Sequence, residues 1–277
     1  AVKADGSPAV AITDHGAMYG VLEFYQKCRK AGIKPIIGLE TYLAPSSRFN
    51  KASKDDEKKN YHLLLLAKNN TGYQNLIKLC TIGHLEGFYY KPRIDWEVLE
   101  KYKEGLIWAT ACLGGEIPFL IKTGQIDKAR QRLLDYKELF GPGNFFLELM
   151  DHPEEPEYEI VNPKLIEFSK ELGLPLLATN DVHYLRRDDD EAQDILLCLQ
   201  NKKKKEDTDR MNMTGADYSL RSAADMAKAF AHVPEAIENT LKVADMCDVE
   251  IELGKTHLPF FAVPEGYDEN SYFRKLC

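Results

Sequence analysis

Short apolar runs alternate with amphipathic segments between residues 9 and 179, and this alternation constrains the fold more than any other feature. The runs have the length and continuous apolar character of buried strands, and we predict strands at 9–13, 35–43, 61–67, 105–111, 144–149 and 175–179. The segments between them have helical periodicity, which predicts helices at 18–31, 70–86, 95–103, 125–140 and 157–173. Apolar strands that alternate with helices indicate a mostly parallel sheet buried on both faces, as in a barrel or a doubly wound sheet.

The pattern changes to helices alone beyond residue 183, and we predict them at 188–201, 222–231 and 234–248. From residue 256 onward, Pro and Gly interrupt the chain in a way that is typical of an extended linker. We therefore divide the chain into one α/β domain at 1–255 and a linker at 256–277. Both ends of the chain fall inside helical patterns, so we expect it to be a fragment of a longer protein.

The composition limits the classes of function. No apolar stretch approaches the ~20 residues of a membrane span, so we expect no membrane partner. The six scattered cysteines contain no CxxC pair and fit a reducing cytoplasm better than a disulfide framework. A net charge of −8 argues against a whole surface built to coat nucleic acid, although it is compatible with a local basic path. The run Lys202–Lys205 is interpreted as a solvated loop.

The end of the last predicted strand is the most informative sequence for function. In the segment Leu174–Tyr184 an apolar run is followed by Asp181 and His183. Residues i and i+2 of extended backbone point the same way, so these two side chains can reach toward one point. A carboxylate and an imidazole in this arrangement suit a divalent metal such as Zn²⁺ or Mn²⁺.

Ligands of the same kind occur at four other strand ends: Asp14 with His15, Glu40, His62, and Cys112. Side chains at strand ends favour a barrel, because its loops gather there over a common centre. His62 begins its strand instead of ending it. We therefore predict that strand 61–67 returns antiparallel to strand 35–43, which places His62 close to Glu40. Each residue alone is more often structural, but together on converging strands they predict one metal site.

Several roles stay open on the residues alone. We interpret His15 as a ligand and Asp14 as its hydrogen-bonded support or as a helix cap. Glu40 has the chemistry to bridge two metals. Cys112 is either a ligand or a core thiol near the turn that follows it. Glu148 alternates with apolar neighbours, and it either faces the site as a base or supporting group or forms a salt bridge.

The remaining candidates are weaker. We interpret three further histidines as structural: His84, His232 and His257. His152, at a strand end, is a slightly stronger candidate for a functional role. Segment 87–93 reads Gly-Phe-Tyr-Tyr-Lys-Pro-Arg. It is either an aromatic and basic surface that clamps a nucleic-acid strand or a packing loop with a charged rim. The sequence contains neither a Gly-rich phosphate loop nor a GxSxG nucleophile elbow.

In order along the chain, these motifs resemble the PHP (polymerase and histidinol phosphatase) domain found at the N-terminus of bacterial replicative DNA polymerase III alpha subunits. The resemblance covers essentially the whole chain. It depends on the segments Ala11–Gly16, Lys34–Glu40, Tyr61–Asn69, Gly87–Arg93, Cys112–Glu116, Ala178–Tyr184 and Leu258–Pro264. So many matches in the same order are far more specific than a single motif.

The resemblance implies an irregular seven-stranded PHP barrel of the (βα)7 type, followed by helices and a linker. It also implies up to three divalent metal ions, Zn²⁺ or Mn²⁺, with the ligands His15, Glu40, His62, Cys112, Asp181 and His183. Of these, Asp181, His183 and Glu40 would carry the catalysis. The family's first motif, a His-x-His on the opening strand, would lie upstream of Ala1. We therefore expect a barrel without its first strand, with an exposed edge, and a polymerase palm beyond the linker.

Three functional hypotheses follow from the resemblance. In some family members the domain is a metal-dependent 3′–5′ proofreading exonuclease, and the parent here would be a replicative DNA polymerase. Its partners would be DNA, the palm and thumb of the same chain, and replication subunits such as the sliding clamp. In other members the domain is a catalytically silent module that stabilises the polymerase. A stand-alone phosphoesterase resembling histidinol phosphatases is disfavoured by the polar insertion at 44–60 and the polymerase-like tail after 256.

Overall fold

The computed structural model of the protein describes residues 1–51, 60–256 and 258–277. Its strands are β1 (Ala9–Ile12), β2 (Lys34–Leu43), β3 (Tyr61–Ala67), β4 (Arg93–Ile94), β5 (Leu106–Ala109), β6 (Phe145–Met150) and β7 (Leu176–Thr179). Its helices are α1 (Val2–Asp5), α2 (Val21–Ala31), α3 (Asn70–Leu85), α4 (Trp96–Lys101), α5 (Glu116–Lys122), α6 (Ile126–Phe140), α7 (Tyr158–Leu172), the 3₁₀ turn η1 (Arg187–Asp189), α8 (Asp190–Asn201), α9 (Ala223–Ala229), α10 (Pro234–Met246) and α11 (Glu269–Leu276). The predictions for His257 and for residues 52–59 of the 44–60 insertion lie outside the described residues.

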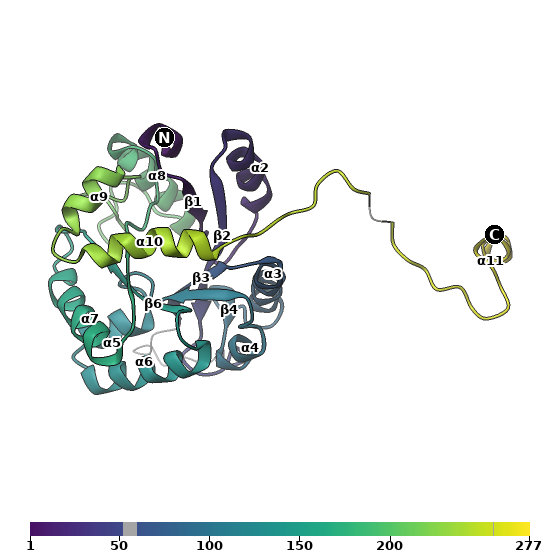
Figure 1. Cartoon of the computed structure of the whole chain (residues 1–277), viewed down its shortest axis with the longest axis horizontal. Coiled ribbons are helices and arrows are strands. Elements are labelled where there is room, and N and C mark those ends of the chain that lie inside the picture. Colours follow the sequence, from purple (N-terminus) through teal and green to yellow (C-terminus); the bar gives the residue numbers. More distant parts are fainter. Residues whose placement is uncertain (52–59, 257) are drawn as a thin grey trace.

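The strands form one curled, mixed sheet in the order β1-β2-β3-β5-β6-β7, with β4 paired to β2 (Figure 1). Strands β1 and β2 are parallel, as are β5, β6 and β7, whereas β3 runs antiparallel to both of its neighbours. The predicted return of β3 against β2 is therefore confirmed. In the register of this hairpin His62 lies opposite Tyr42, two residues from Glu40 along the same strand.

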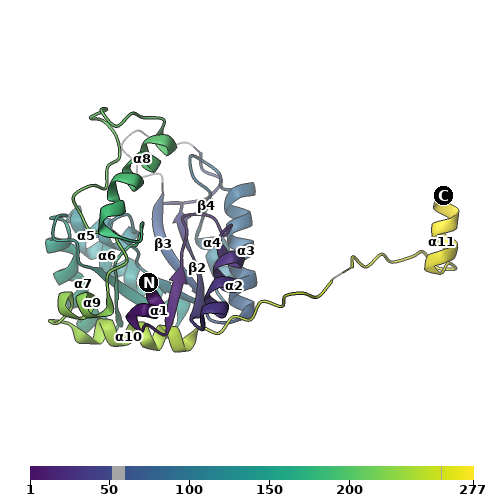
Figure 2. The same ribbon diagram turned by 90° about the horizontal axis from the view of Figure 1, so that it is seen from above.

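The sheet does not close on itself among the described residues, because β1 and β7 form its two ends and do not pair with each other. Helices cover the outside of the curved sheet, and α10 lies across one end of the barrel, opposite the end where α8 is found (Figures 1 and 2). This α/β architecture is the expected PHP-type barrel lacking one strand.

Alternate residues along each strand enter two different cores. One face of the sheet packs against the helices through residues such as Ile37, Leu65 and Trp108. The opposite, inner face forms a second core in which strand residues contact α10: Ile36, Leu64, Leu66, Ile107, Ala109, Phe146 and Leu177, with Val243, Ala244 and Cys247. Because both faces are buried, the strands read as continuous apolar runs and not as alternating ones.

The predicted elements are all present, with ends shifted by a few residues. Helix α2 begins at Val21 and not at residue 18, because the chain first makes a turn that places Gly20 at the N-cap. The helical pattern expected at the N-terminal end is present as α1, whereas two short elements were not predicted: β4 and α5. They span two and seven residues, which is less than the window in which strand or helical periodicity can be recognised.

Two features project from the body. Helix α8 extends beyond one end of the barrel (Figure 2). Beyond α10 the chain continues as an extended segment that leads to α11, which lies apart from the body in both views (Figures 1 and 2). The division of the chain at residue 255 stays a prediction. None of the helices within the described ranges has both the length and the apolar character needed to cross a membrane.

Candidate metal centre

The inner face of the sheet positions the first ligands. Ile36 and Leu64 belong to the inner core, and Glu40 and His62 lie an even number of residues from them on β2 and β3. The two-residue period of a strand therefore carries Glu40 and His62 to the same inner side, at one end of the sheet. Because β2 and β3 are antiparallel, a residue near the end of β2 meets one at the start of β3.

Within the described part of the chain, one group of three side chains has all its potential ligand atoms within 4.8 Å of one another: His15, Glu40 and His62. Glu40 lies between the two imidazoles. Its Oε1 is 2.8 Å from Nδ1 of His62, and its Oε2 is 3.8 Å from Nδ1 of His15. Glu40 therefore presents one carboxylate oxygen to each imidazole. The backbone of the turn that follows His15 is held against β2, because the N–H of Gly16 donates to the carbonyl of Glu40 at 2.9 Å.

The other three predicted ligands surround this group. The Sγ of Cys112 is 3.5 Å from Nδ1 of His62 and 3.9 Å from Oε1 of Glu40. The ring of His183 approaches from the β7 side, with its centroid 5.8 Å from that of His15. Its Nδ1 is 3.8 Å from Oδ1 of Asp181. The structure thus brings all six predicted ligands to one place, although Cys112, Asp181 and His183 do not complete the 4.8 Å group.

Unusual backbone conformations shape the loops that carry two of these ligands. Ala111 and Asp181 have φ values of 60° and 46°, in the left-handed region that residues other than glycine seldom adopt. Such a conformation costs on the order of 1–3 kcal/mol and persists where the surroundings impose it, often at functional sites. Close packing adds a further constraint, because a Cβ at Gly114 would lie 2.9 Å from Nδ1 of His62. Any larger residue at position 114 would therefore require the imidazole of His62 to shift.

Burial and crowded negative charge govern the electrostatics of the centre. Burial, reinforced by the charge of Glu40, raises the pKa of Asp181 to about 6. Burial, with Asp181 and Glu40 nearby, raises the pKa of the Cys112 thiol well above its usual range. Burial lowers the pKa of His15 despite the opposing effect of Glu40. For Glu40 itself burial acts to raise the pKa, but the hydrogen bond from His62 and the charge of His15 hold it below the usual value.

This donor set fits a divalent cation. Imidazole, carboxylate and thiolate are the side-chain ligands that zinc takes in proteins. Three acidic groups that share a buried space oppose one another's ionisation, and a cation among them would relieve that opposition. Glu148 is a fourth acidic group in this buried space. Its Oε2 is buried and has no hydrogen-bond partner among the described residues.

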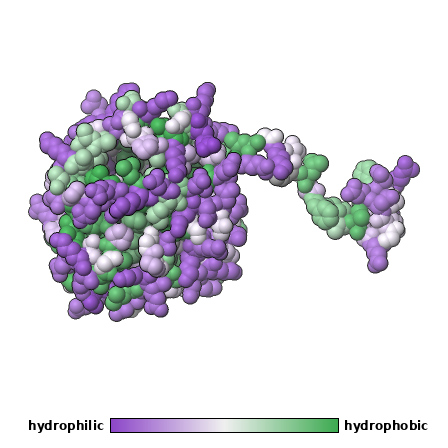
Figure 3. Space-filling view, in the orientation of Figure 1, coloured by the Kyte–Doolittle hydropathy of each residue, from purple (hydrophilic) through white to green (hydrophobic). Residues whose placement is uncertain are grey.

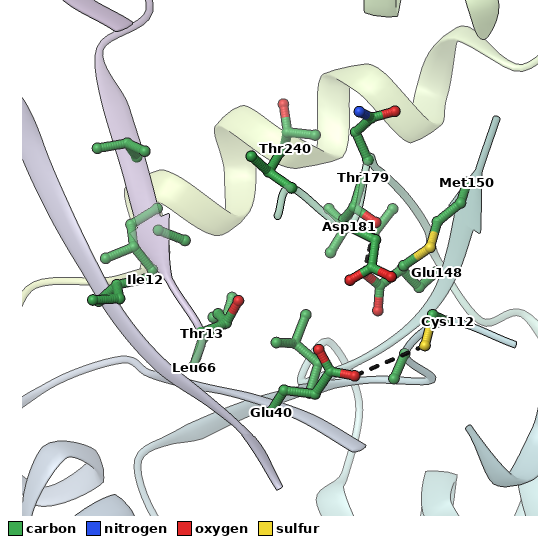
Figure 4. A pocket seen from close by; sticks show the side chains of 18 of the residues that line it. Ile12, Thr13, Glu40, Leu66, Cys112, Glu148, Met150, Thr179, Asp181 and Thr240 are labelled. Atoms are coloured by element: carbon green, nitrogen blue, oxygen red, sulfur yellow. Dashed lines mark hydrogen bonds between the residues drawn. The ribbon is translucent and has the colours of Figure 1, made fainter. Parts of the chain in front are cut away.

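A cavity of about 550 Å³ extends from the ligands into the open side of the barrel. Figure 4 shows its two walls, with Ile12 and Thr13 of the β1 side facing Thr179 and Asp181 of the β7 side. Glu40 and Cys112 lie at its polar end (Figure 4). On the surface, a hollow bordered by apolar side chains is visible among mostly hydrophilic residues (Figure 3). The metal-type ligands are therefore reached through a partly apolar cavity.

The open alternatives for Glu148 and Asp14 have different outcomes. Glu148 lines the cavity and accepts a hydrogen bond of 2.6 Å from the hydroxyl of Thr179. No salt bridge involves it among the described residues, so the salt-bridge interpretation is wrong. Asp14 also lines the cavity. The helix-cap interpretation of Asp14 is wrong, because Gly20 is the N-cap of α2.

Several other interpretations are resolved as well. Nε2 of His84 lies 2.8 Å from the carbonyl of Gly16, and the ring of His232 stacks near that of Phe230, contacts of the kind that structural histidines make. His152 is only 1% exposed, and neither of its ring nitrogens has a hydrogen-bond partner among the described residues. Lys202–Lys205 follow α8 in an exposed loop, as predicted.

Sequence reasoning missed two aromatic neighbours of the centre. The ring of Tyr42 lies 6.0 Å from that of His15 and 5.3 Å from that of His62. Its position two residues after Glu40 on β2 was a usable signal. The ring of Tyr218 lies 5.5 Å from that of His183. Tyr218 comes from an irregular segment between α8 and α9, where no periodicity points to a site.

Comparison with known proteins shows the family to which this sequence belongs. The model of the PHP domain matches residues 1–152, which is more than half of the chain. The chain belongs to the PHP domain family. Among curated proteins, this PHP chain is similar to the DNA polymerase III subunit alpha of Borreliella burgdorferi, with 46% identity over 260 residues and 94% of the chain. It is also similar to the proteins of the same name from Treponema pallidum, at 42% identity over 98% of the chain, and Thermus aquaticus, at 42% over 97%.

The PHP chain is short relative to these proteins. It spans 22% of the Borreliella protein, 23% of the Treponema protein and 22% of the Thermus protein. The activity of those whole proteins therefore does not transfer directly to the chain.

Proposed function

We propose that this chain is the PHP region of a DNA polymerase III alpha subunit, and that its ligand cluster is a divalent-metal site for hydrolysis of the 3′-terminal phosphodiester of DNA. The names of the relatives support the first part. The second part depends on one observation, the convergence of His15, Glu40 and His62 within 4.8 Å, with Cys112, Asp181 and His183 around them. A cytoplasmic location and partners such as the palm, the thumb, the sliding clamp and DNA follow from the same parent.

Each ligand residue has a distinct role in this proposal. Glu40 presents one oxygen toward each imidazole, and it would hold the metal together with His15 and His62. Asp181 and His183 supply the ligands from the other wall. When bound, divalent ions would lower the pKa of a water molecule and stabilise the charge that develops on the phosphate. We favour Zn²⁺ or Mn²⁺, because the set mixes nitrogen, oxygen and sulfur donors.

The protein's own residues shape the rest of the reaction space. Ile12 and Leu177 give the cavity partly apolar walls. Glu148 retains a proton near neutral pH in the metal-free site, because burial raises its pKa to about 8. Its hydrogen bond from Thr179 fixes the carboxyl group beside the ligands.

The test is the substitution Asp181→Asn in the full-length polymerase, with Asp127→Asn as a matched control because Asp127 is exposed on α6. We expect the 3′–5′ hydrolysis of a labelled, mispaired primer to fall by at least 100-fold with Asp181→Asn, while nucleotide addition continues. The control should retain both activities. Mass spectrometry of bound metal should show fewer ions in Asp181→Asn. Unchanged hydrolysis with Asp181→Asn would refute the proposed chemistry.

A catalytically silent, stabilising site is the second candidate. It is favoured by the separation of the ligands along the chain, from His15 to His183, since a shared ion would connect the two ends of the sheet. In that case bound metal would raise the melting temperature, and the full-length polymerase would show no metal-dependent hydrolysis of the primer. The third hypothesis, a stand-alone phosphoesterase, receives no support from the relatives described above.

A further inference from the structure

A tight turn of aromatic and basic residues lies beside the metal centre, and we call residues 87–93 the aromatic turn. The N–H of Tyr89 donates to the carbonyl of Lys91 at 3.0 Å, which closes the turn around Tyr90. Tyr90 has a φ of 61°, in the left-handed region. A tyrosine in this conformation is uncommon, and it places the ring at the tip of the turn.

The aromatic turn packs directly against the segment that carries His15. A Cβ at Gly16 would lie 2.8 Å from Cγ of Pro92, so the ring of Pro92 packs closely against the backbone of Gly16. The Nζ of Lys91 lies 5.4 Å from the ring centroid of Tyr42, the tyrosine that contacts both His15 and His62. One ring therefore separates the ammonium group of Lys91 from the ligands.

Buried ionic contacts brace the turn from beneath. The guanidinium of Arg93 donates to the carbonyls of Gly87 at 3.1 Å, Arg48 at 3.2 Å and Asn50 at 2.9 Å. Arg48 in turn pairs with the buried carboxylate of Asp95 at 3.0 Å. A surface held in this way loses little conformational freedom when it binds a ligand.

Packing within the fold accounts for some residues of the aromatic turn and not for others. Arg93 lies over the ring of Tyr89 at 5.0 Å, and both belong to the bracing side. The rings of Phe88 and Tyr90 each contact one neighbouring ring, that of His84 and that of Tyr89, but they remain 51% and 67% exposed. Large rings exposed together on a rigid turn are typical of a binding surface, because burying them in the fold would otherwise be favourable. The turn thus has a packing side and an outward, aromatic side.

We propose that Phe88, Tyr90 and Lys91 form a docking surface for the single-stranded 3′ end of DNA, next to the metal centre. This inference rests on the proposed function, since it identifies how the substrate of that site is held. Exposed rings stack on unpaired bases, whereas a lysine contacts the phosphate between them. A mispaired end exposes such bases more readily than a paired end does. With a chain of net charge −8, attraction to DNA has to be local, as it is on this turn.

The first test measures binding apart from cleavage, by fluorescence anisotropy of the full chain with a labelled oligothymidylate whose phosphorothioate links resist hydrolysis. We expect Phe88→Ala and Tyr90→Gly each to weaken binding by about fivefold to tenfold, at the lower end of the effect of one stacked base. Glycine at position 90 removes the ring and suits the left-handed backbone. The control Phe260→Ala removes a ring that is 91% exposed on the extended tail, and it should leave binding unchanged.

The second test separates charge from stacking. Lys91→Gln should weaken binding and reduce the slope of log K against log salt concentration by about 0.7, as expected when one phosphate contact to a single strand is lost. Lys101→Gln is the matched control, because Nζ of Lys101 lies 5.3 Å from the ring of Tyr102, in the same kind of contact but on α4. Circular dichroism should give the same melting temperature for Phe88→Ala, Lys91→Gln and both controls.

Two results would overturn the docking surface. One is binding that all three turn variants leave unchanged, and the other is binding that the controls weaken equally. The outcome is distinguishable from that of the proposed function. Weakened binding in a protein without hydrolysis would support the docking surface and reject the hydrolysis. Hydrolysis of a mispaired primer with unaltered binding by every turn variant would reject the docking surface alone.

Discussion

The buried carboxyl group of Glu148 should make the metal-free protein less stable as the pH rises. Glu148 is 5% exposed, its Oε1 accepts one hydrogen bond from Thr179, and its Oε2 has no partner among the described residues. Burial raises its pKa from 4.5 to about 8, with the negative charges of Glu40 and Asp181 contributing. The substitution Glu148→Gln keeps the shape of the side chain and removes its ionisation.

The sign of the effect follows from which state holds the proton. Between pH 4.5 and about 8 the unfolded chain releases the proton of Glu148, whereas the folded protein retains it. The stability that this group contributes is therefore complete below pH 4.5 and is lost as the pH rises through 8. At ~1.4 kcal/mol per pH unit, the rise from pH 4.5 to about 8 lowers the free energy of unfolding by about 5 kcal/mol.

Urea denaturation followed by circular dichroism, at several pH values in EDTA, would measure this difference. We expect Glu148→Gln to gain stability over the natural protein as the pH rises from 4.5 to 8, by up to about 5 kcal/mol. The exposed Glu100 provides the control, and Glu100→Gln should follow the curve of the natural protein. If the curves for Glu148→Gln and the natural protein stay parallel within about 1 kcal/mol, the carboxyl is not held protonated by burial.

Three further predictions concern stability. A Cβ in Gly72→Ala would meet the carbonyl oxygen of Gly105 at 1.9 Å, so we expect a loss of ~2–3 kcal/mol by urea denaturation. Gly173→Ala has open space at a φ of 62° and should lose only ~1 kcal/mol; equal losses would contradict the steric explanation. Arg48→Met leaves the buried Asp95 without its guanidinium, and we expect a loss of about 3 kcal/mol, which Arg48→Lys should partly restore. EDTA should lower the melting temperature measured by calorimetry, and an unchanged value would show that no stabilising metal was bound.

Much of the fold was predictable because its strands are apolar and its helices are periodic. The hairpin of β2 and β3 was predicted from chemistry, since His62 could reach Glu40 only if β3 ran back along β2. The two-residue β4 was beyond prediction, because it depends on pairing with β2 and not on any local pattern. The N-terminal start of α2 was misplaced for a similar reason, as the turn before Gly20 is set by contacts with distant residues.

The ligands of the candidate site were predictable from residue type and strand position, whereas its surroundings were not. Glu40 and His62 occur near strand ends, where a carboxylate or imidazole contrasts with apolar neighbours. Lys91 and Tyr218 carry no such contrast, and they reach the site only through the way separate loops fold over it. Contacts of this kind depend on tertiary packing and leave no periodic trace in the sequence.

The order of the ligands along the chain has a consequence for biosynthesis. The residues that meet at the centre range from His15, just after β1, to His183, just after β7. At a translation rate of about 5–20 residues per second, His183 is made roughly 10–30 s after His15. During that interval on the ribosome Cys112 and the early imidazoles have no opposite wall to cover them. A nascent chain would therefore expose a free thiol and two imidazoles before the barrel that encloses them exists.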